Sequence, residues 1–315
     1  MKQYTHAWLA FKAIERLEKV DLSPPNRKYA DSLITWFKIN RDGTIKGAWY
    51  PDSVIKDMAN SHVLKFTPAD QGNKDFRKLP TNYRMYEFGK TTALYKKPYN
   101  VDKHDNLPNR CEALAHSVID NLKMQESEEK GSPIAPTDNH VATIFFMLSH
   151  YVADAHVPFH CDNRSFSSGC DLHGHAEKEW DDEIRKYYRI DTQTERFLYT
   201  PEGYPLLKPD NQYNTSFLKS LENELNNRDF KITWGSGNRN VYDFMSAVCQ
   251  YSYLLSYGFV PMGYDETNVS LSNWHNLDGQ SPSFDDLSVM VFTDAIDSIA
   301  RVWLRVWRKY VKWRK

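Results

Sequence analysis

The chain has 315 residues, of which 41% are hydrophobic, and a formal net charge of -1. This length and composition argue against a disordered protein and allow one large or two modest hydrophobic cores. The near-neutral charge gives no overall attraction to nucleic acid or to an anionic membrane, so such an attraction would need a local patch. The cysteines are too few for a disulfide scaffold, and Cys161 and Cys170 could either pair or stay reduced.

Apolar residues recur at helical spacing along most of the chain, which predicts an all-α fold. The expected helices, in chain order, cover residues 6–20, 29–39, 110–124, 138–157, 174–188, 217–225, 241–257 and 287–311. Long loops are expected between several of them. The longest, at 66–109, is rich in proline, asparagine, lysine and tyrosine, which is typical of a solvated insertion with at most a short helix.

The start of the chain lacks the basic segment and apolar run of a signal peptide, and no stretch reaches the ~20 apolar residues of a membrane span. The protein is therefore expected to be cytoplasmic by default, or secreted if a leader has been removed. Because candidate ligands run from residue 6 to residue 179, no domain boundary can be drawn in that span. We expect a single domain, 1–315, in which 1–190 carries the motifs and the helices of 214–315 complete the bundle.

The helix predicted to end near Pro158 is where we expect the chemistry. His150 and Asp154 are four residues apart and share one helical face, and His160 follows the helix end, where its imidazole can turn back toward them. A single His-x-x-x-Asp pair in an apolar helix is more often a satisfied buried hydrogen bond than a metal site. His156 lies about 200° round the helix from Asp154 and is expected to point away.

Other potential metal ligands are spread along the first half of the chain. His6 stands at the start of the first predicted helix. Asp52 lies in a loop whose backbone is constrained by the preceding proline, and His62 follows ten residues later. None of the three would indicate a metal site alone.

A further ligand-rich stretch covers residues 172–180. His175 and Glu179 form an i, i+4 pair on one helical face, and His173 with Glu177 has the same spacing, so spacing alone leaves the register open. The remaining histidines lie outside these motifs and are expected to be ordinary surface or core residues: His104, His116, His140 and His275.

Together these motifs resemble a known superfamily, the zinc-dependent phospholipases C and the fungal single-strand-specific nucleases, which share an all-helical fold around three zinc ions. The resemblance covers residues 1–190 and is closer to the phospholipase C branch. It rests on five motifs in the family's order: Thr5-His6-Ala7-Trp8, Tyr50-Pro51-Asp52, Ser61-His62, His150-x-x-x-Asp154-x-x-x-x-x-His160 and Gly174-His175-x-x-x-Glu179.

The resemblance implies three zinc ions, with one carboxylate shared by two of them. The first ion would be bound by Asp52, His62, His150 and Asp154. The second would be bound by His160, His175 and Glu179. The third would be bound by His6, Asp154 and the amine of the first residue, here Met1.

The resemblance also implies phosphodiester hydrolysis by a metal-bridging hydroxide, with Asp52 orienting or deprotonating the attacking water. We expect a phospholipase C-like enzyme acting on a phospholipid or another phosphodiester. A nuclease is the less favoured alternative. The nucleases carry an aromatic residue and an aspartate that bind a base, and this chain has Val63-Leu64-Lys65 in their place. Ser53 stands where the choline-binding enzymes carry an aromatic residue, so the resemblance does not predict which head group the substrate carries.

A zinc-stabilised binding protein without activity is the third alternative. A complete ligand set argues against it, because buried polar groups without a purpose would cost stability.

The last predicted helix has acidic residues toward its start and basic residues toward its end, which suits the helix dipole. Its Trp303, Trp307 and Trp313 could contact a lipid headgroup layer, but packing inside the helical bundle is the favoured interpretation. We expect a monomer with at most transient contact with a membrane surface.

Overall fold

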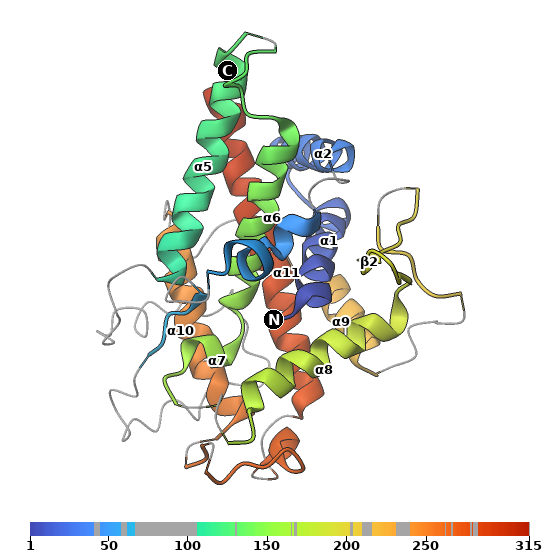
Figure 1. Ribbon diagram of the computed structural model, residues 1–315, viewed down its shortest axis with the longest axis vertical. Coiled ribbons are helices and arrows are strands. Elements are labelled where there is room, and N and C mark those ends of the chain that lie inside the picture. The colour runs from blue at the N-terminus through green and yellow to red at the C-terminus, as the bar shows by residue number, and fades with distance from the viewer. Residues whose placement is uncertain are drawn as a thin grey trace.

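Long helices make up most of the structure, which confirms the all-α prediction (Figure 1). The computed structural model describes residues 1–40, 45–57, 62–66, 106–129, 131–164, 166, 169–201, 204–209, 216–230, 240–261, 263–265, 267–277, 279 and 283–314. The helices are α1 (Gln3–Lys19), α2 (Pro24–Ile39), α5 (Leu107–Ser127), α6 (Asp138–Asp154), α7 (Pro158–Cys161), α8 (Leu172–Tyr187), α9 (Ser216–Asn227), α10 (Val241–Phe259) and α11 (Phe284–Trp313).

Short elements connect these helices. They are the 3-10 helices η2 (Ile45–Ala48) and η6 (Trp274–Asn276), the π-helix η3 (Pro51–Ile55), and the strands β1 (Ile190–Asp191) and β2 (Arg196–Phe197). The two strands pair antiparallel, with Ile190 opposite Phe197. Most of the loop predicted at 66–109, including His104, lies outside the described residues.

Helix α11 passes through the middle of the bundle and packs against α1, α2, α5, α6 and α9 (Figure 1). The indole Nε1 of Trp303 donates to the Phe145 carbonyl at 2.9 Å, and that of Trp307 donates to Ser32 Oγ at 2.8 Å. Both rings are buried, whereas Trp313 is exposed. The predicted packing role is therefore confirmed for Trp303 and Trp307, which lie too deep to contact a lipid layer.

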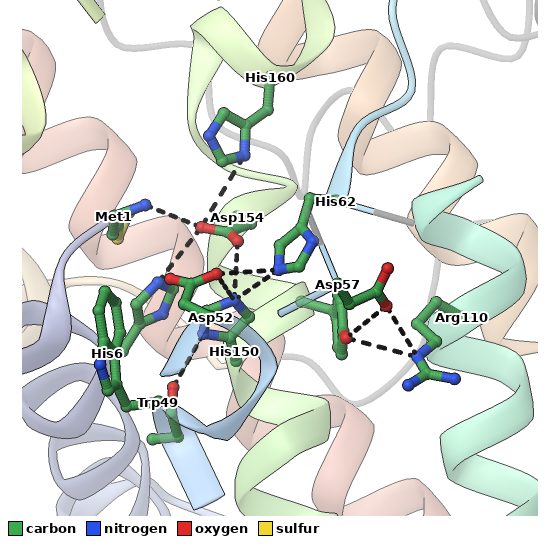
Figure 2. Close-up of polar contacts among 12 residues, drawn as sticks. Met1, His6, Trp49, Asp52, Asp57, His62, Arg110, His150, Asp154 and His160 are labelled. Atoms are coloured by element: carbon green, nitrogen blue, oxygen red, sulfur yellow. Dashed lines mark hydrogen bonds and ion pairs between the residues drawn. The ribbon is translucent and has the colours of Figure 1, made fainter. Parts of the chain in front are cut away.

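Helix α6 is capped by Thr137, whose side chain accepts a hydrogen bond from the backbone N–H of His140 at 3.2 Å. Its apolar residues are buried on nearly every side. The helix ends at Asp154, and Val157 has an extended backbone, as the residue before a proline prefers. The short turn between α6 and α7 directs the chain back, so that His160 lies close to the end of α6 (Figure 2).

Several helices begin earlier than predicted, and in two of them, α5 and α8, a side-chain cap explains the shift. Asn106 accepts from the backbone N–H of Asn109 at 3.1 Å, and α5 therefore starts at Leu107 rather than near residue 110. Asp171 accepts from the backbone N–H of Gly174 at 3.2 Å, and α8 starts at Leu172 rather than at Gly174. The second of these shifts bears on the candidate site.

The four cysteines are free, so Cys161 and Cys170 do not pair. Cys161 is buried and Cys170 is half-buried. Within the described ranges, no helix combines the length and the apolar composition that crossing a bilayer requires.

Candidate metal centre

The potential ligands His6, Asp52, His62, His150, Asp154 and His160 come together at the centre of the bundle (Figure 2). They are carried by α1, η3, the segment 62–66, α6 and α7. All of them except Asp52 are buried. The sequence motifs therefore converge in space, although they span more than 150 residues of the chain.

The first group consists of His62, His150, Asp52 and Asp154. His62 Nε2 lies 3.1 Å from His150 Nε2 and 3.2 Å from Asp52 Oδ1. His150 Nε2 lies 3.1 Å from Asp154 Oδ2 and 3.6 Å from Asp52 Oδ1. Ligand atoms at tetrahedral positions around zinc lie about 3.3 Å apart, given zinc–ligand bonds of ~2.0–2.2 Å. These spacings are compatible with ligands of one small cation, and the ligand atoms of His62, His150 and Asp154 all lie within 4.8 Å of one another.

The backbone fixes the orientation of the His150 ring. His150 Nδ1 lies 2.8 Å from the Ala48 carbonyl oxygen and donates to it, which leaves a lone pair on Nε2, the nitrogen that faces the other ligands. The approach of η2 to α6 depends on Gly47, where an added Cβ would lie 2.6 Å from the Thr143 carbonyl oxygen. Only glycine at this position allows the Ala48 carbonyl to reach the imidazole.

The second group consists of His160, His173 and Glu177. His160 Nε2 lies 3.0 Å from His173 Nε2 and 3.3 Å from Glu177 Oε1, and His173 Nε2 lies 2.9 Å from Glu177 Oε1. His160 Nδ1 also lies 3.9 Å from Asp154 Oδ1, which joins the second group to the first.

This second group corrects the predicted register on α8. His175 and Glu179 do not face His160; Glu179 instead pairs with His275 at 3.2 Å, and 45% of its side chain is exposed. His173 and Glu177 each precede the predicted residue by two positions, which is about 200° round a helix. The face of α8 that meets α7 therefore carries His173 and Glu177, while His175 and Glu179 lie on the other side.

A matched pair of variants tests this register. Glu177→Gln is expected to lower the zinc affinity of the chain at least tenfold, because the buried carboxylate loses its charge beside two imidazoles. Glu179→Gln, two residues away and exposed, is expected to leave affinity unchanged. Bound zinc per chain after dialysis, measured by elemental analysis, reads out both. A larger loss in Glu179→Gln than in Glu177→Gln would restore the register predicted from the motif.

The Met1 amine and His6 lie on the remaining side of Asp154. The amine is 2.9 Å from Asp154 Oδ1 and 2.8 Å from Glu177 Oε1. His6 Nε2 is 3.4 Å from Asp154 Oδ1, and its ring stacks on that of His150 with 3.9 Å between centroids. His6 is also within reach of Asp52 and His150, with which it forms a third potential ligand group.

Burial and neighbouring charges set the protonation states at the centre. Burial lowers the pKa of His6 to about 4, aided by His150, and burial also lowers the pKa of His160. Burial alone would raise the pKa of Asp154 and of Glu177, but the Met1 amine and the imidazoles hold both well below their usual range. At neutral pH these imidazoles carry lone pairs and these carboxylates are ionised, which is the state that binds a cation.

Several buried ring nitrogens at the centre have no hydrogen-bond partner among the described residues. They are both nitrogens of His6, Nδ1 of His62 and Nδ1 of His160. Buried polar groups are normally paired, so unpaired imidazole nitrogens beside three carboxylates are consistent with a site built for metal.

The histidines outside the motifs are placed as expected where the structure describes them. His156 Nε2 bonds to Ser298 Oγ on α11 at 2.9 Å, so it points away from the ligands, and burial lowers its pKa to about 4. His116 pairs with Glu112 at 3.0 Å on the surface of α5. The motifs missed His173 and Glu177. The capping pattern Asp171-x-x-Gly174 was the sequence signal that α8 starts earlier, at Leu172.

The fold and these groups define a mostly helical, single-domain protein with buried His, Asp and Glu clusters that could hold metal ions. Comparisons with known protein families, with curated proteins and with solved structures found no significant match.

Proposed function

We propose that the protein is a zinc-dependent phosphodiester hydrolase of the phospholipase C and single-strand nuclease type. The observation that carries this proposal is the clustering of Asp52, His62, His150 and Asp154, whose neighbouring ligand atoms lie 3.1 to 3.6 Å apart, with Asp154 also facing a second ligand group. Imidazole nitrogen and carboxylate oxygen together suit zinc better than magnesium or calcium, which prefer oxygen ligands alone.

Three zinc ions are proposed, and Asp154 is shared by two of them. Asp52, His62, His150 and Asp154 would hold the first. His160, His173 and Glu177 would hold the second. His6 and Asp154 would hold the third, together with the Met1 amine once it loses its proton. Burial alone would lower the pKa of that amine, but Asp154 and Glu177 outweigh burial and raise the pKa to about 11. Bound there, zinc would lower the pKa of a coordinated water and stabilise negative charge on a phosphoryl group.

Asp52 is the proposed base that orients or deprotonates the attacking water. Its side chain is 20% exposed, against 10% for His62 and 2% for Asp154, so it is the carboxylate of the first group that is nearest to solvent. Burial raises the pKa of Asp52, but the hydrogen bond with His62 and the nearby imidazole of His150 outweigh this and lower it. Asp52 is therefore ionised at neutral pH and able to accept a proton.

A phospholipid or another phosphodiester is the favoured substrate. Leu64, in the segment after His62, is buried, and its backbone N–H donates to the His160 carbonyl at 3.3 Å. The Val63 carbonyl accepts from the backbone N–H of Leu107 at 3.2 Å. Val63 and Leu64 contact the rest of the fold and offer no aromatic surface on which a base could stack. This favours a phospholipase over a nuclease.

Metal removal combined with parallel assays tests the proposal. Purified protein is analysed for zinc and assayed on phosphatidylcholine, single-stranded DNA and a generic chromogenic phosphodiester, each with and without a chelator. We expect bound zinc and chelator-sensitive hydrolysis of the phospholipid, restored by added zinc. DNA cleavage alone would favour the nuclease, and zinc without hydrolysis would favour a zinc-stabilised binding protein.

A further inference from the structure

One candidate ligand, His62, lacks the support that a metal-binding imidazole normally has. Such a histidine usually donates its second ring N–H to a carboxylate, carbonyl or water, which fixes the ring orientation. His150 follows this rule through the Ala48 carbonyl, at 2.8 Å from Nδ1. In the described part of the chain, Nδ1 of His62 is buried and has no hydrogen-bond partner. Packing is therefore the contact that the described residues offer to this ring.

The ring of Tyr151 forms the wall against which His62 packs. The two ring centroids are 5.0 Å apart, at an interplanar angle of 45°, and Tyr151 also meets His150 edge-on at 5.3 Å. Tyr151 follows His150 directly on α6 and is fully buried. A single aromatic side chain therefore contacts both imidazoles of the first ligand group.

Polar contacts in turn fix Tyr151. Its hydroxyl donates to Asp57 Oδ2 at 2.9 Å, and burial raises its pKa, so the hydroxyl stays protonated. Arg110 Nε donates to the same hydroxyl at 3.4 Å and lies 3.5 Å from Asp57 Oδ2, with its guanidinium carbon 5.5 Å from the ring centroid (Figure 2). These contacts join α5, α6 and the residues that follow η3.

Asp57 also ties this support to the segment that carries Asp52. The backbone N–H of Asp57 donates to the Pro51 carbonyl at 3.0 Å, and Lys56 between them has a left-handed backbone, with φ of 54°. A non-glycine residue in this conformation is costly and persists where the surroundings impose it. The turn thus returns Asp57 toward Tyr151 while Asp52 faces His62.

We infer that Tyr151, held by Asp57 and Arg110, is the positioning residue that keeps His62 aimed at the first metal site. The inference rests on the proposed function in so far as it requires the chain to bind zinc. Tyr151 touches neither substrate nor metal in this role; it acts through His62.

Zinc affinity and the cobalt absorption spectrum test the inference. Tyr151→Leu removes the aromatic wall and is expected to lower zinc affinity 10- to 100-fold in competition with a chromophoric chelator, the range seen when outer-shell partners of ligands are lost. Tyr151→Phe and Asp57→Asn keep the wall but weaken its anchoring, and smaller losses are expected. The visible spectrum of cobalt-substituted Tyr151→Leu should show an altered coordination, whereas Tyr151→Phe should resemble the unaltered chain.

Tyr310 provides the matched control, because it is also buried and its hydroxyl donates to a carboxylate, Glu126 Oε1, at 2.7 Å. Tyr310→Leu is expected to lower the melting temperature and leave zinc affinity unchanged. Unchanged zinc affinity in Tyr151→Leu, or an equal loss of affinity in Tyr310→Leu, would overturn this inference but would not affect the proposed function. An unaltered chain that binds no zinc would overturn it together with the proposed function.

Discussion

Asp154→Asn is expected to reduce bound zinc from the three proposed ions to one and to lower the proposed hydrolysis rate about 10³-fold or more. Oδ1 of Asp154 faces the Met1 amine at 2.9 Å, His6 Nε2 at 3.4 Å and His160 Nδ1 at 3.9 Å, and Oδ2 faces His150 Nε2 at 3.1 Å. An amide has no charge and only one acceptor oxygen. It therefore cannot replace a carboxylate that serves two of the proposed ions.

The size of this effect follows from what the metals supply. Metal ions contribute several kcal/mol of transition-state stabilisation, and each ~1.4 kcal/mol is a factor of ten in rate. The ion held by His160, His173 and Glu177 is expected to remain, because none of its ligands is changed. Zinc per chain by elemental analysis and the initial rate on a generic phosphodiester are the two measurements.

Asp294→Asn separates loss of metal from loss of stability. Asp294 is also buried and ion-paired, with Arg228 at 2.6 Å, but it lies on α11 away from the ligand groups. Breaking this pair is expected to destabilise the fold, since the buried charge of Arg228 then has only Asp297, at 3.3 Å, to balance it, yet it should leave zinc content unchanged. Full zinc content in Asp154→Asn would contradict the proposed sharing of this carboxylate.

Asp52→Asn is expected to abolish turnover while most of the zinc stays bound. The amide oxygen can still occupy the ligand position 3.2 Å from His62 Nε2, but it cannot accept a proton at neutral pH. Loss of a general base costs about 10²- to 10⁴-fold in rate. The measurement is kcat beside zinc content, for this variant and the unaltered chain.

The pH dependence of kcat provides the control for this role. If Asp52 is the base, the acidic limb of the profile should be absent from the residual activity of Asp52→Asn. An Asp52→Asn variant with near-normal kcat would show that another group activates the water. An inactive variant that has also lost its zinc would show that the lost activity follows from the loss of Asp52 as a ligand, which would contradict the expected role as a base.

Much of this architecture follows from local sequence patterns. Apolar periodicity predicted the main helices, because a helix buries one face and the period of 3.6 residues records which face. The spacing of His150 and Asp154 placed both on one side of α6, and the proline at 158 predicted the break that brings His160 back. The candidate ligands comprise His6 and the seven side chains of the first two ligand groups. Motif order predicted six of these eight residues: His6, Asp52, His62, His150, Asp154 and His160.

Other features depended on tertiary structure. His173 with Glu177 and His175 with Glu179 have identical spacing, so only the packing of α8 against its neighbours decided which pair meets His160. The Ala48 carbonyl reaches His150 across 102 residues of sequence, and the Tyr151–Asp57 contact spans 94.

The physical reason for this division is the range of the interactions involved. Helix formation and capping depend on residues three or four positions apart, so the sequence by itself determined the helices and the residue types able to bind metal. Which side chains share a site depends on how closely distant segments approach, as at Gly47, where a single added carbon would collide with α6. Only the tertiary structure decided the α8 register and the support of His62.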